Sequence, residues 1–105
     1  MEDKLLSLLG LARRAGKLAL GADAAEEALR GGKAALAVLA ADISPRTEEA
    51  ARRAAAQHGV PVCKLRWTMD RLGAAVGKRA GVIAVKDAGF AGAIAALWQT
   101  AATEE

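Results

Sequence analysis

The chain has 105 residues, of which 53% are hydrophobic and 26% charged, so it is not intrinsically disordered; we expect one globular domain over residues 1–105. The net charge of +3 favours an anionic partner such as nucleic acid, although solubility explains a charge of this size almost as well. The chain has a single cysteine, its N-terminus is unlike a secretory signal, and no apolar run is long enough to span a membrane. We therefore predict a cytoplasmic protein with no membrane partner.

The predicted secondary structure alternates between helices and strands. Leucine and alanine at helical spacing predict a first helix over residues 3–15, and continuous apolar runs predict buried strands at residues 34–40 and 82–85. The other predicted elements are strands at residues 17–20 and 60–65 and helices at residues 23–30, 45–58, 69–76 and 88–98. This order predicts an α/β sandwich with helices on both faces of a small, mostly parallel sheet.

Polar residues stand at three of the predicted helix starts. Asp23, Ser44 and Thr68 are of the types that cap helices, because their side-chain oxygens accept from first-turn amides. Pro45 follows Ser44 at the first helical position, where proline is favoured. We therefore expect these three residues to act as N-caps.

Residues that usually perform catalysis or bind metal are few. His58, the only histidine, lies near a predicted helix end, where a capping role is the stronger interpretation. Cys63 lies in an apolar strand, and Trp67 and Trp98 are better explained by packing than by base stacking. No metal-ligand spacing and no phosphate-binding glycine motif is present. We expect no catalysis, no metal and no cofactor.

Three junctions between predicted elements have similar turns, at residues 20–23, 41–45 and 77–81. In α/β proteins the loops at one edge of the sheet gather into a binding surface, and helix N-termini there offer unpaired amides to anions. Gly21 would let another backbone approach closely. The fold needs tight turns in any case, and spacing alone favours that simpler interpretation.

Basic residues lie near two of these junctions. Arg13, Arg14 and Lys17 precede the first, and Lys78 and Arg79 lie within the third. If the junctions converge, these charges would flank one surface that can contact phosphates. Taken singly, each is more simply explained as a solvated surface charge.

Five segments together carry a resemblance: LLGLARRAGKLALG (8–21), EEALRGGKAALAVLAADISP (26–45), HGVPV (58–62), LGAAVGK (72–78) and VIAVKDAGF (82–90). They resemble the kink-turn-binding ribosomal protein L7Ae family, and within it the bacterial YlxQ-like branch, over nearly the whole chain. The resemblance implies a three-layer α-β-α sandwich with a four-stranded mixed sheet, in place of the mostly parallel one. It also implies binding to structured RNA, typically the kink-turn with its tandem sheared G·A pairs, and no catalysis.

The resemblance further implies where RNA would bind. The family's recognition segment starts at a glycine, which is matched by Gly21. It continues with an Asn-Glu pair, at whose positions this chain has Asp23 and Ala24, and with a lysine, at whose position it has Glu27. The turn after the second strand and the loop that receives an extruded nucleotide correspond to residues 42–45 and 76–81. With the basic residues added, the expected RNA-binding set is Arg13, Arg14, Lys17, Gly21, Asp23, Ala24, Glu27, Ile43, Val76, Lys78, Arg79 and Ala80.

The residues after Gly21 depart from the family in a way that matters chemically. Guanine presents the acceptors N7 and O6 in the major groove, so its recognition requires donors such as an Asn amide or a Lys ammonium. Ionised Asp23 and Glu27 only accept, and they repel phosphates. Either residue could accept from adenine N6 or cytosine N4, which would mean a different RNA target.

We therefore expect a monomeric, non-enzymatic RNA-binding protein of translation or ribosome assembly, with ribosomal or ribonucleoprotein components as possible partners. The alternative is a protein-interaction module on the same scaffold, whose acidic helix start binds a basic partner. An enzyme or a small-ligand binder is the weaker third alternative.

Overall fold

The computed structural model describes the backbone of residues 2–104 and the side chains of residues 4–100. The helices are α1 (Glu2–Arg14), α2 (Ala22–Arg30), α3 (Pro45–Ala56), α4 (Met69–Val76) and α5 (Ala88–Glu104), and the strands are β1 (Leu18–Leu20), β2 (Leu36–Leu39), β3 (Val62–Lys64) and β4 (Val82–Val85). The predicted alternation is confirmed. The last helix extends beyond the predicted end at Trp98, because no glycine or proline follows to stop it.

The four strands form one mixed sheet in the order β1-β4-β2-β3. β4 runs antiparallel to both β1 and β2, and only β2 and β3 are parallel. The mixed sheet implied by the family resemblance is confirmed, and the expectation of a mostly parallel sheet is wrong.

The direction of β4 is set by the segment that precedes it. Near the start of this segment the Ala41 N–H donates to the Trp67 carbonyl at 2.8 Å, and at its end the Ala40 N–H donates to the Gly81 carbonyl at 2.9 Å. The eight-residue helix α4 between them therefore returns the chain to the end of the sheet where β2 finishes. A strand that begins there can only run opposite to β2.

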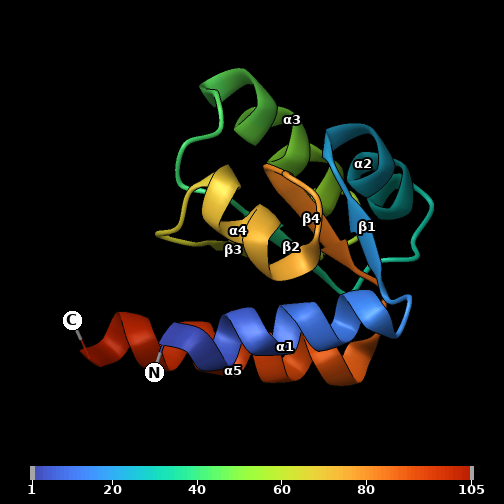
Figure 1. The fold of residues 1–105 in the computed structure, drawn as a ribbon. Coiled ribbons are helices and arrows are strands. Elements are labelled where there is room, and N and C mark those ends of the chain that lie inside the picture. The colour runs from blue at the N-terminus through green and yellow to red at the C-terminus, as the bar shows by residue number, and fades with distance from the viewer. Residues whose placement is uncertain (1, 105) are drawn as a thin grey trace.

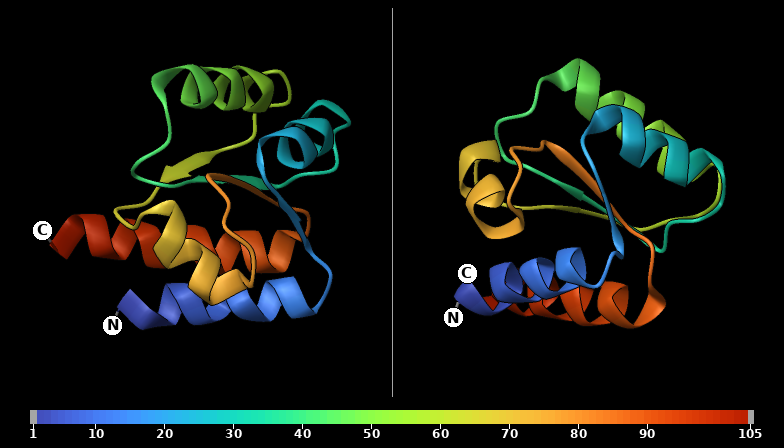
Figure 2. Two further views of the ribbon diagram at one scale, coloured as in Figure 1. Left: turned by 45° about the horizontal axis from the view of Figure 1, so that its top comes forward. Right: turned by 45° about the vertical axis from the view of Figure 1, so that its right-hand side comes forward.

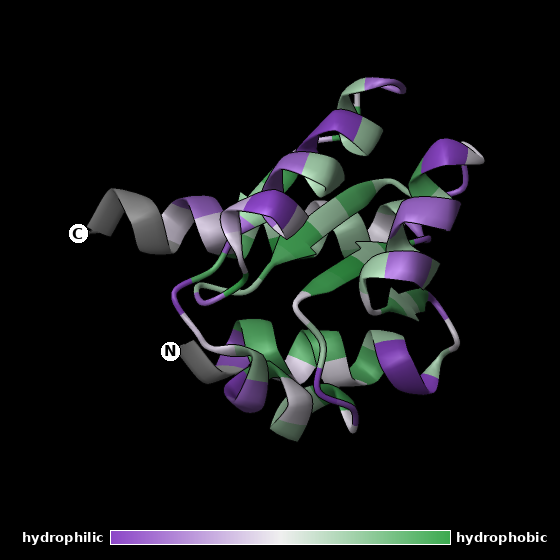
Figure 3. Ribbon diagram, turned by 90° about the horizontal axis from the view of Figure 1, so that it is seen from above, coloured by the Kyte–Doolittle hydropathy of each residue, from purple (hydrophilic) through white to green (hydrophobic). Residues whose placement is uncertain are grey.

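Helices cover both faces of this sheet. α1 and α5 lie side by side on one face and α2 and α3 on the other, while α4 packs on α1 (Figure 1). Turned views show the same three layers (Figure 2). The central strands β2 and β4 are buried along their whole length, and hydrophobic residues concentrate on them and on the helix sides that face them (Figure 3). The α-β-α sandwich is confirmed.

Two of the three predicted caps are confirmed. Ser44 Oγ accepts from the Thr47 N–H at 3.1 Å, and Thr68 Oγ1 accepts from the Arg71 N–H at 3.2 Å. The prediction that Asp23 caps α2 is wrong. The N-cap is Gly21, which makes no side-chain cap, and Asp23 lies within the first turn.

His58 and Cys63 have structural surroundings. The His58 Nε2 lies 3.1 Å from the Arg30 carbonyl oxygen, to which it can only donate, so the ring ties the segment after α3 to the end of α2 rather than capping its own helix. Cys63 is 2% exposed, and burial raises the pKa of its thiol to about 11. The prediction that Cys63 packs as a small hydrophobic residue is confirmed.

We expect the Cys63 thiol to be unreactive in the folded protein. Its pKa is raised, so the neutral thiol predominates at neutral pH, and the surrounding core excludes reagents. A colorimetric thiol assay at neutral pH should give no signal within minutes for native protein and one full equivalent in guanidinium chloride. Rapid labelling without denaturant would contradict this.

Candidate nucleic-acid interface

The three junctions singled out in the sequence meet at one end of the sheet. The Gly21 N–H donates to the Val82 carbonyl at 2.9 Å, which places the start of α2 beside the start of β4. The hydrogen bond from the Ala40 N–H to the Gly81 carbonyl places the segment that follows β2 beside the start of β4 as well. Because β4 runs opposite to β1 and β2, their ends lie beside its beginning. We call this surface, formed by residues 21–24, 42–44 and 77–81, the junction face.

The centre of the junction face is a shallow pocket of about 430 Å³. Gly81 is essential to its shape, since a Cβ there would lie 2.5 Å from Ile43 Cγ2 and 3.0 Å from Met69 Sδ. Both side chains therefore close over the first residues of β4. The pocket is lined by Ala22, Asp42, Ile43, Ser44, Thr47, Met69, Gly81 and Val82.

The start of α2 is open to solvent on this face. Gly21 has φ of 96°, a region favoured by glycine, and no atom lies within 4 Å of where its Cβ would be. The Ala25 N–H makes the first intrahelical bond, to the Gly21 carbonyl at 2.9 Å, so the amides of residues 22–24 have no acceptor within the helix. Asp23, Ala24 and Glu27 are all exposed beside them.

The basic loop is held against α4. Gly77 ends that helix with φ of 86°, and a Cβ on Gly73 would lie only 2.9 Å from the Arg79 Cα. Arg79 Nε donates to Asp70 Oδ1 at 2.6 Å, with both side chains largely exposed. Lys78 is exposed and has no ion-pair partner among the described residues. Since exposed ion pairs contribute little stability, Arg79 is available to exchange Asp70 for a phosphate.

Three residues of the expected RNA-binding set are buried. Val76 and Ala80 are 3% and 4% exposed, and Ile43 is 9% exposed. The side chains of Val76 and Ala80 anchor the loop in the hydrophobic core. Ile43 packs in the same core and also lines the pocket with its small exposed part. Their low exposure indicates that these three residues mainly shape the backbone of the junction face, and their contact with RNA stays a prediction.

Arg13, Arg14 and Lys17 are not brought to the junction face. The Lys17 carbonyl accepts from the Lys86 N–H at 2.8 Å, at the end of β1 opposite to Gly21. At about 3.3 Å per residue, the strand places Lys17 roughly 13 Å from Gly21. The expectation that these charges flank the same surface as Lys78 is wrong, because a strand carries its two ends to opposite edges of the sheet.

The sequence did not indicate that Met69 would lie beside the junction face, or that Asp42 of the turn at residues 42–45 would bind it. Asp42 Oδ1 accepts from the Met69 N–H at 2.8 Å, and this bond joins the turn after β2 to the start of α4. Met69 in turn packs over Gly81. The cap at Thr68 signalled where α4 begins, but no local pattern indicated that its first turn would lie on the β2 turn.

Comparison with known proteins identifies the family. The model of the ribosomal protein L7Ae/L30e/S12e/Gadd45 family matches residues 3–95. The chain belongs to this family. No protein with a curated description matches it.

Two solved structures with the fold of this family member illustrate the likeness. A protein with unknown function from Bacillus halodurans C is 37% identical, with a TM-score of 0.86 over 91% of this chain and 97% of that one. The Giardia lamblia 15.5kD RNA binding protein is 24% identical, with a TM-score of 0.72 over 92% of this chain and 82% of the other. At the lower identity the likeness concerns the fold alone.

The junction face of this L7Ae family member carries charges of both signs. Asp23 and Asp42 are its exposed acids, and Lys78 and Arg79 are the exposed bases of its loop. Glu27 is exposed one helical turn after Asp23, next to this face. Within the described residues no group of three His, Cys, Asp or Glu side chains could hold a metal ion. Nor does any helix of the described chain have the length and apolarity that crossing a membrane requires. The groups exposed on the junction face are backbone amides at the start of α2 and charged side chains.

Proposed function

We propose that this protein binds structured RNA through the junction face and performs no catalysis. The observation that carries the proposal is the convergence of the start of α2 with the loop at residues 77–81, fastened by the bond from the Gly21 N–H to the Val82 carbonyl. Membership of the family supports it, as does the fold shared with the Giardia lamblia RNA binding protein. We place the protein as a monomer in the cytoplasm, in the bacterial YlxQ-like branch, within ribonucleoproteins of translation or ribosome assembly.

The proposed contacts use the exposed groups of the junction face. Backbone amides of residues 22–24 and the bare Cα of Gly21 allow close approach of a nucleotide. Lys78 contacts a phosphate directly, and Arg79 does so after leaving Asp70. The target is a kink-turn or a related bent RNA. Asp23, Ala24 and Glu27 supply no donors to guanine, so the preference for tandem sheared G·A pairs is weakened.

A titration tests this proposal. Binding is measured by fluorescence anisotropy for a kink-turn RNA, for the same RNA with its G·A pairs disrupted and for a plain duplex, at several salt concentrations. We expect the two bent or bulged RNAs to bind more tightly than the duplex, with a modest difference between them. Equal affinities with a steep salt slope would indicate only a basic surface. No binding at low salt would refute the RNA proposal.

Removing the Lys78 charge should weaken RNA binding through the loss of one phosphate contact. Lys78→Ala deletes one proposed phosphate contact, so the slope of log affinity against log salt should fall by about 1 in magnitude. Arg53→Ala is the matched control, since it also removes one positive charge, from an exposed side chain near the far end of α3. If both variants change the slope equally, net charge rather than a contact at Lys78 is responsible.

The exposed acidic start of α2 supports a second candidate, a protein-interaction module that binds a basic partner. Asp23 on the junction face and Glu27 one helical turn further along α2 are exposed, and both would repel phosphates and attract lysine or arginine. Purification of the tagged protein before and after nuclease treatment separates the two functions. Partners that persist after nuclease and are lost on Asp23→Asn with Glu27→Gln would favour this candidate.

A further inference from the structure

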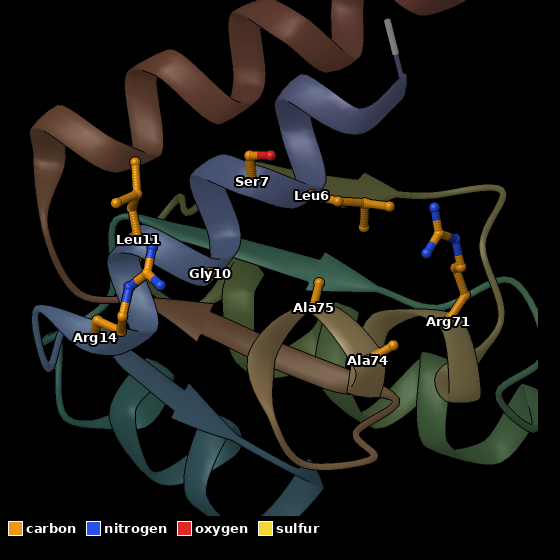
Figure 4. A pocket seen from close by; sticks show the side chains of 8 residues that line it. All are labelled: Leu6, Ser7, Gly10, Leu11, Arg14, Arg71, Ala74 and Ala75. Atoms are coloured by element: carbon orange, nitrogen blue, oxygen red, sulfur yellow. The ribbon is translucent and has the colours of Figure 1, made fainter.

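A second basic surface lies at the end of the sheet opposite to the junction face. The Lys86 N–H donates to the Lys17 carbonyl at 2.8 Å, and this bond joins the end of β4 to the start of β1. Figure 4 shows the Arg14 side chain at the C-terminal end of α1, at the turn that leads into β1. We call the four exposed cations at this end of the sheet the basic patch: Arg13, Arg14, Lys17 and Lys86.

The turn after α1 fixes the backbone of three of these cations. Gly16 has φ of 73°, a region favoured by glycine, and its N–H donates to the Arg13 carbonyl at 3.0 Å. The Lys17 N–H donates to the Ala12 carbonyl at 2.9 Å. These two bonds close the end of α1 onto the start of β1, so that Arg13, Arg14 and Lys17 project from a tightly hydrogen-bonded turn.

The charges of the basic patch have no acidic partner among the side chains that the structure describes. Asp87 follows Lys86 in the chain, but its Oδ2 accepts from the Phe90 N–H at 2.9 Å and so caps α5. A cation is favourable at a helix C-terminus, which explains Arg13 and Arg14 without a ligand. Lys86 instead precedes the N-terminus of α5, where the helix dipole disfavours a positive charge. Folding therefore gives no local reason for the charge of Lys86, whereas an anion bound from outside does.

The outer edge of β1 connects the basic patch with the junction face. β1 is an edge strand, and no strand of the described chain pairs with its outer side. Because Lys17 and Gly21 are both hydrogen-bonded to β4, the backbone N–H groups at the alternate positions Leu18 and Leu20 point away from it. Such groups can donate to phosphate or sugar oxygens. The edge therefore offers donors between the two surfaces.

The distance between the two surfaces suits one RNA molecule. At about 3.3 Å per residue, β1 separates Lys17 from Gly21 by roughly 13 Å. A nucleic-acid helix advances by about 3.4 Å per nucleotide of each strand, so an RNA held at Gly21 covers this distance within roughly four nucleotides. The stem of a bound RNA is thus long enough to reach the basic patch.

We propose that an RNA bound at the junction face continues along the open edge of β1, and that the basic patch holds phosphates of its stem. This inference rests on the RNA function proposed above and adds a second phosphate site to it. RNA suits the patch better than an acidic protein does, because protein interfaces are depleted in lysine and nucleic-acid interfaces are much more positively charged. Contacts to phosphates add affinity and orient the RNA without reading its sequence. They would also offset the repulsion of phosphates by Asp23 and Glu27.

Two RNAs that differ in stem length test the inference. One is a kink-turn RNA with long stems, and in the other each stem is shorter by about six base pairs, or roughly 20 Å of helix. The variant is Lys17→Ala with Lys86→Ala, whose mutual hydrogen bond is made by the backbone and is therefore kept. It should bind the long-stem RNA about tenfold more weakly, with a slope of log affinity against log salt smaller by about 2 in magnitude. Anisotropy titrations at several salt concentrations measure both quantities.

A matched variant controls for net charge. Arg52→Ala with Arg53→Ala also removes two positive charges, from α3 on the opposite face of the sheet from α1 (Figure 1). On the long-stem RNA this control should lose much less affinity than the variant of the basic patch. On the short-stem RNA the two double variants should bind alike, because the stem no longer reaches Lys17 and Lys86.

The outcomes separate this inference from the function on which it rests. If the wild type binds both RNAs but the two double variants lose the same affinity on the long-stem RNA, only the stem contact is refuted. An equal loss of the patch variant on both RNAs would refute it as well. If the wild type binds neither RNA, the function proposed for the junction face fails too. Amide shifts at Lys17 and Lys86 with a polyglutamate peptide but not with the long-stem RNA would overturn the inference in favour of an acidic protein partner.

Discussion

Replacing Asp23 with asparagine and Glu27 with lysine should tighten binding to a kink-turn RNA by at least tenfold. Both positions are exposed on the first turns of α2, beside the amides of the junction face. The substitutions exchange two acceptors for donors that can reach guanine N7 and O6, and a good base contact contributes about 1–3 kcal/mol of discrimination. They also remove repulsion from nearby phosphates. Anisotropy titrations of the wild type and the double variant provide the comparison.

Two controls distinguish recognition from added charge. The gain should largely vanish on RNA whose G·A pairs are disrupted, because the new donors then lack their acceptors. Glu49→Lys changes the charge as Glu27→Lys does, on an exposed position of α3, and should improve binding to both RNAs alike. If the double variant binds the kink-turn RNA with the same affinity as the wild type, α2 is not the recognition segment. The titration with duplex RNA would then decide whether the RNA proposal itself survives.

Gly81→Ala should destabilise the fold by about 1–3 kcal/mol, the usual cost of overpacking. The added Cβ would lie 2.5 Å from Ile43 Cγ2 and 3.0 Å from Met69 Sδ, so both side chains must move out of contact with β4. For a chain of this size the midpoint of thermal unfolding should fall by roughly 4 °C or more per kcal/mol. Thermal unfolding followed by circular dichroism measures the change.

A double-mutant cycle assigns this loss to the proposed contact. Ile43→Ala removes the atom nearest to the new Cβ, so the double variant should lose less stability than the two single losses added together. Gly92→Ala is the control, because no atom lies within 4 Å of its Cβ position in α5, and there alanine should be neutral or stabilising. Additive losses in the cycle would mean that the strain at Gly81 does not arise from Ile43.

Local signals predicted the secondary structure well. Ser44 and Thr68 cap the helices they were expected to cap, and the apolar runs at β2 and β4 are buried throughout. Such features depend on residues within a few positions of one another. The prediction for Asp23 was wrong because aspartate is favoured both as a cap and in the first turn of a helix. The N-cap is Gly21, because glycine readily adopts a φ of 96°.

The candidate site was predictable only in part. The glycine-bounded turns marked Gly21 and the loop at residues 77–81, and their convergence is confirmed by backbone hydrogen bonds. Burial of Val76 and Ala80 was not predictable, because a loop of small residues can face either the core or solvent. Lys17 is close to Gly21 in the sequence, but it does not lie beside Gly21 in the fold. Its carbonyl instead accepts a hydrogen bond from the Lys86 N–H.

By itself the sequence determined the order and type of the elements, two of the helix caps and the membership of the family, since these reside in local patterns and in motifs along the chain. Only the tertiary structure decided the strand order, the direction of β4 and the separation of two charged surfaces. Those features follow from where α4 returns the chain, from the close approach of Gly10 to the Ala75 backbone and from the side chains that pack against Gly81. Contacts between residues far apart in sequence determine them, and no local pattern encodes such contacts.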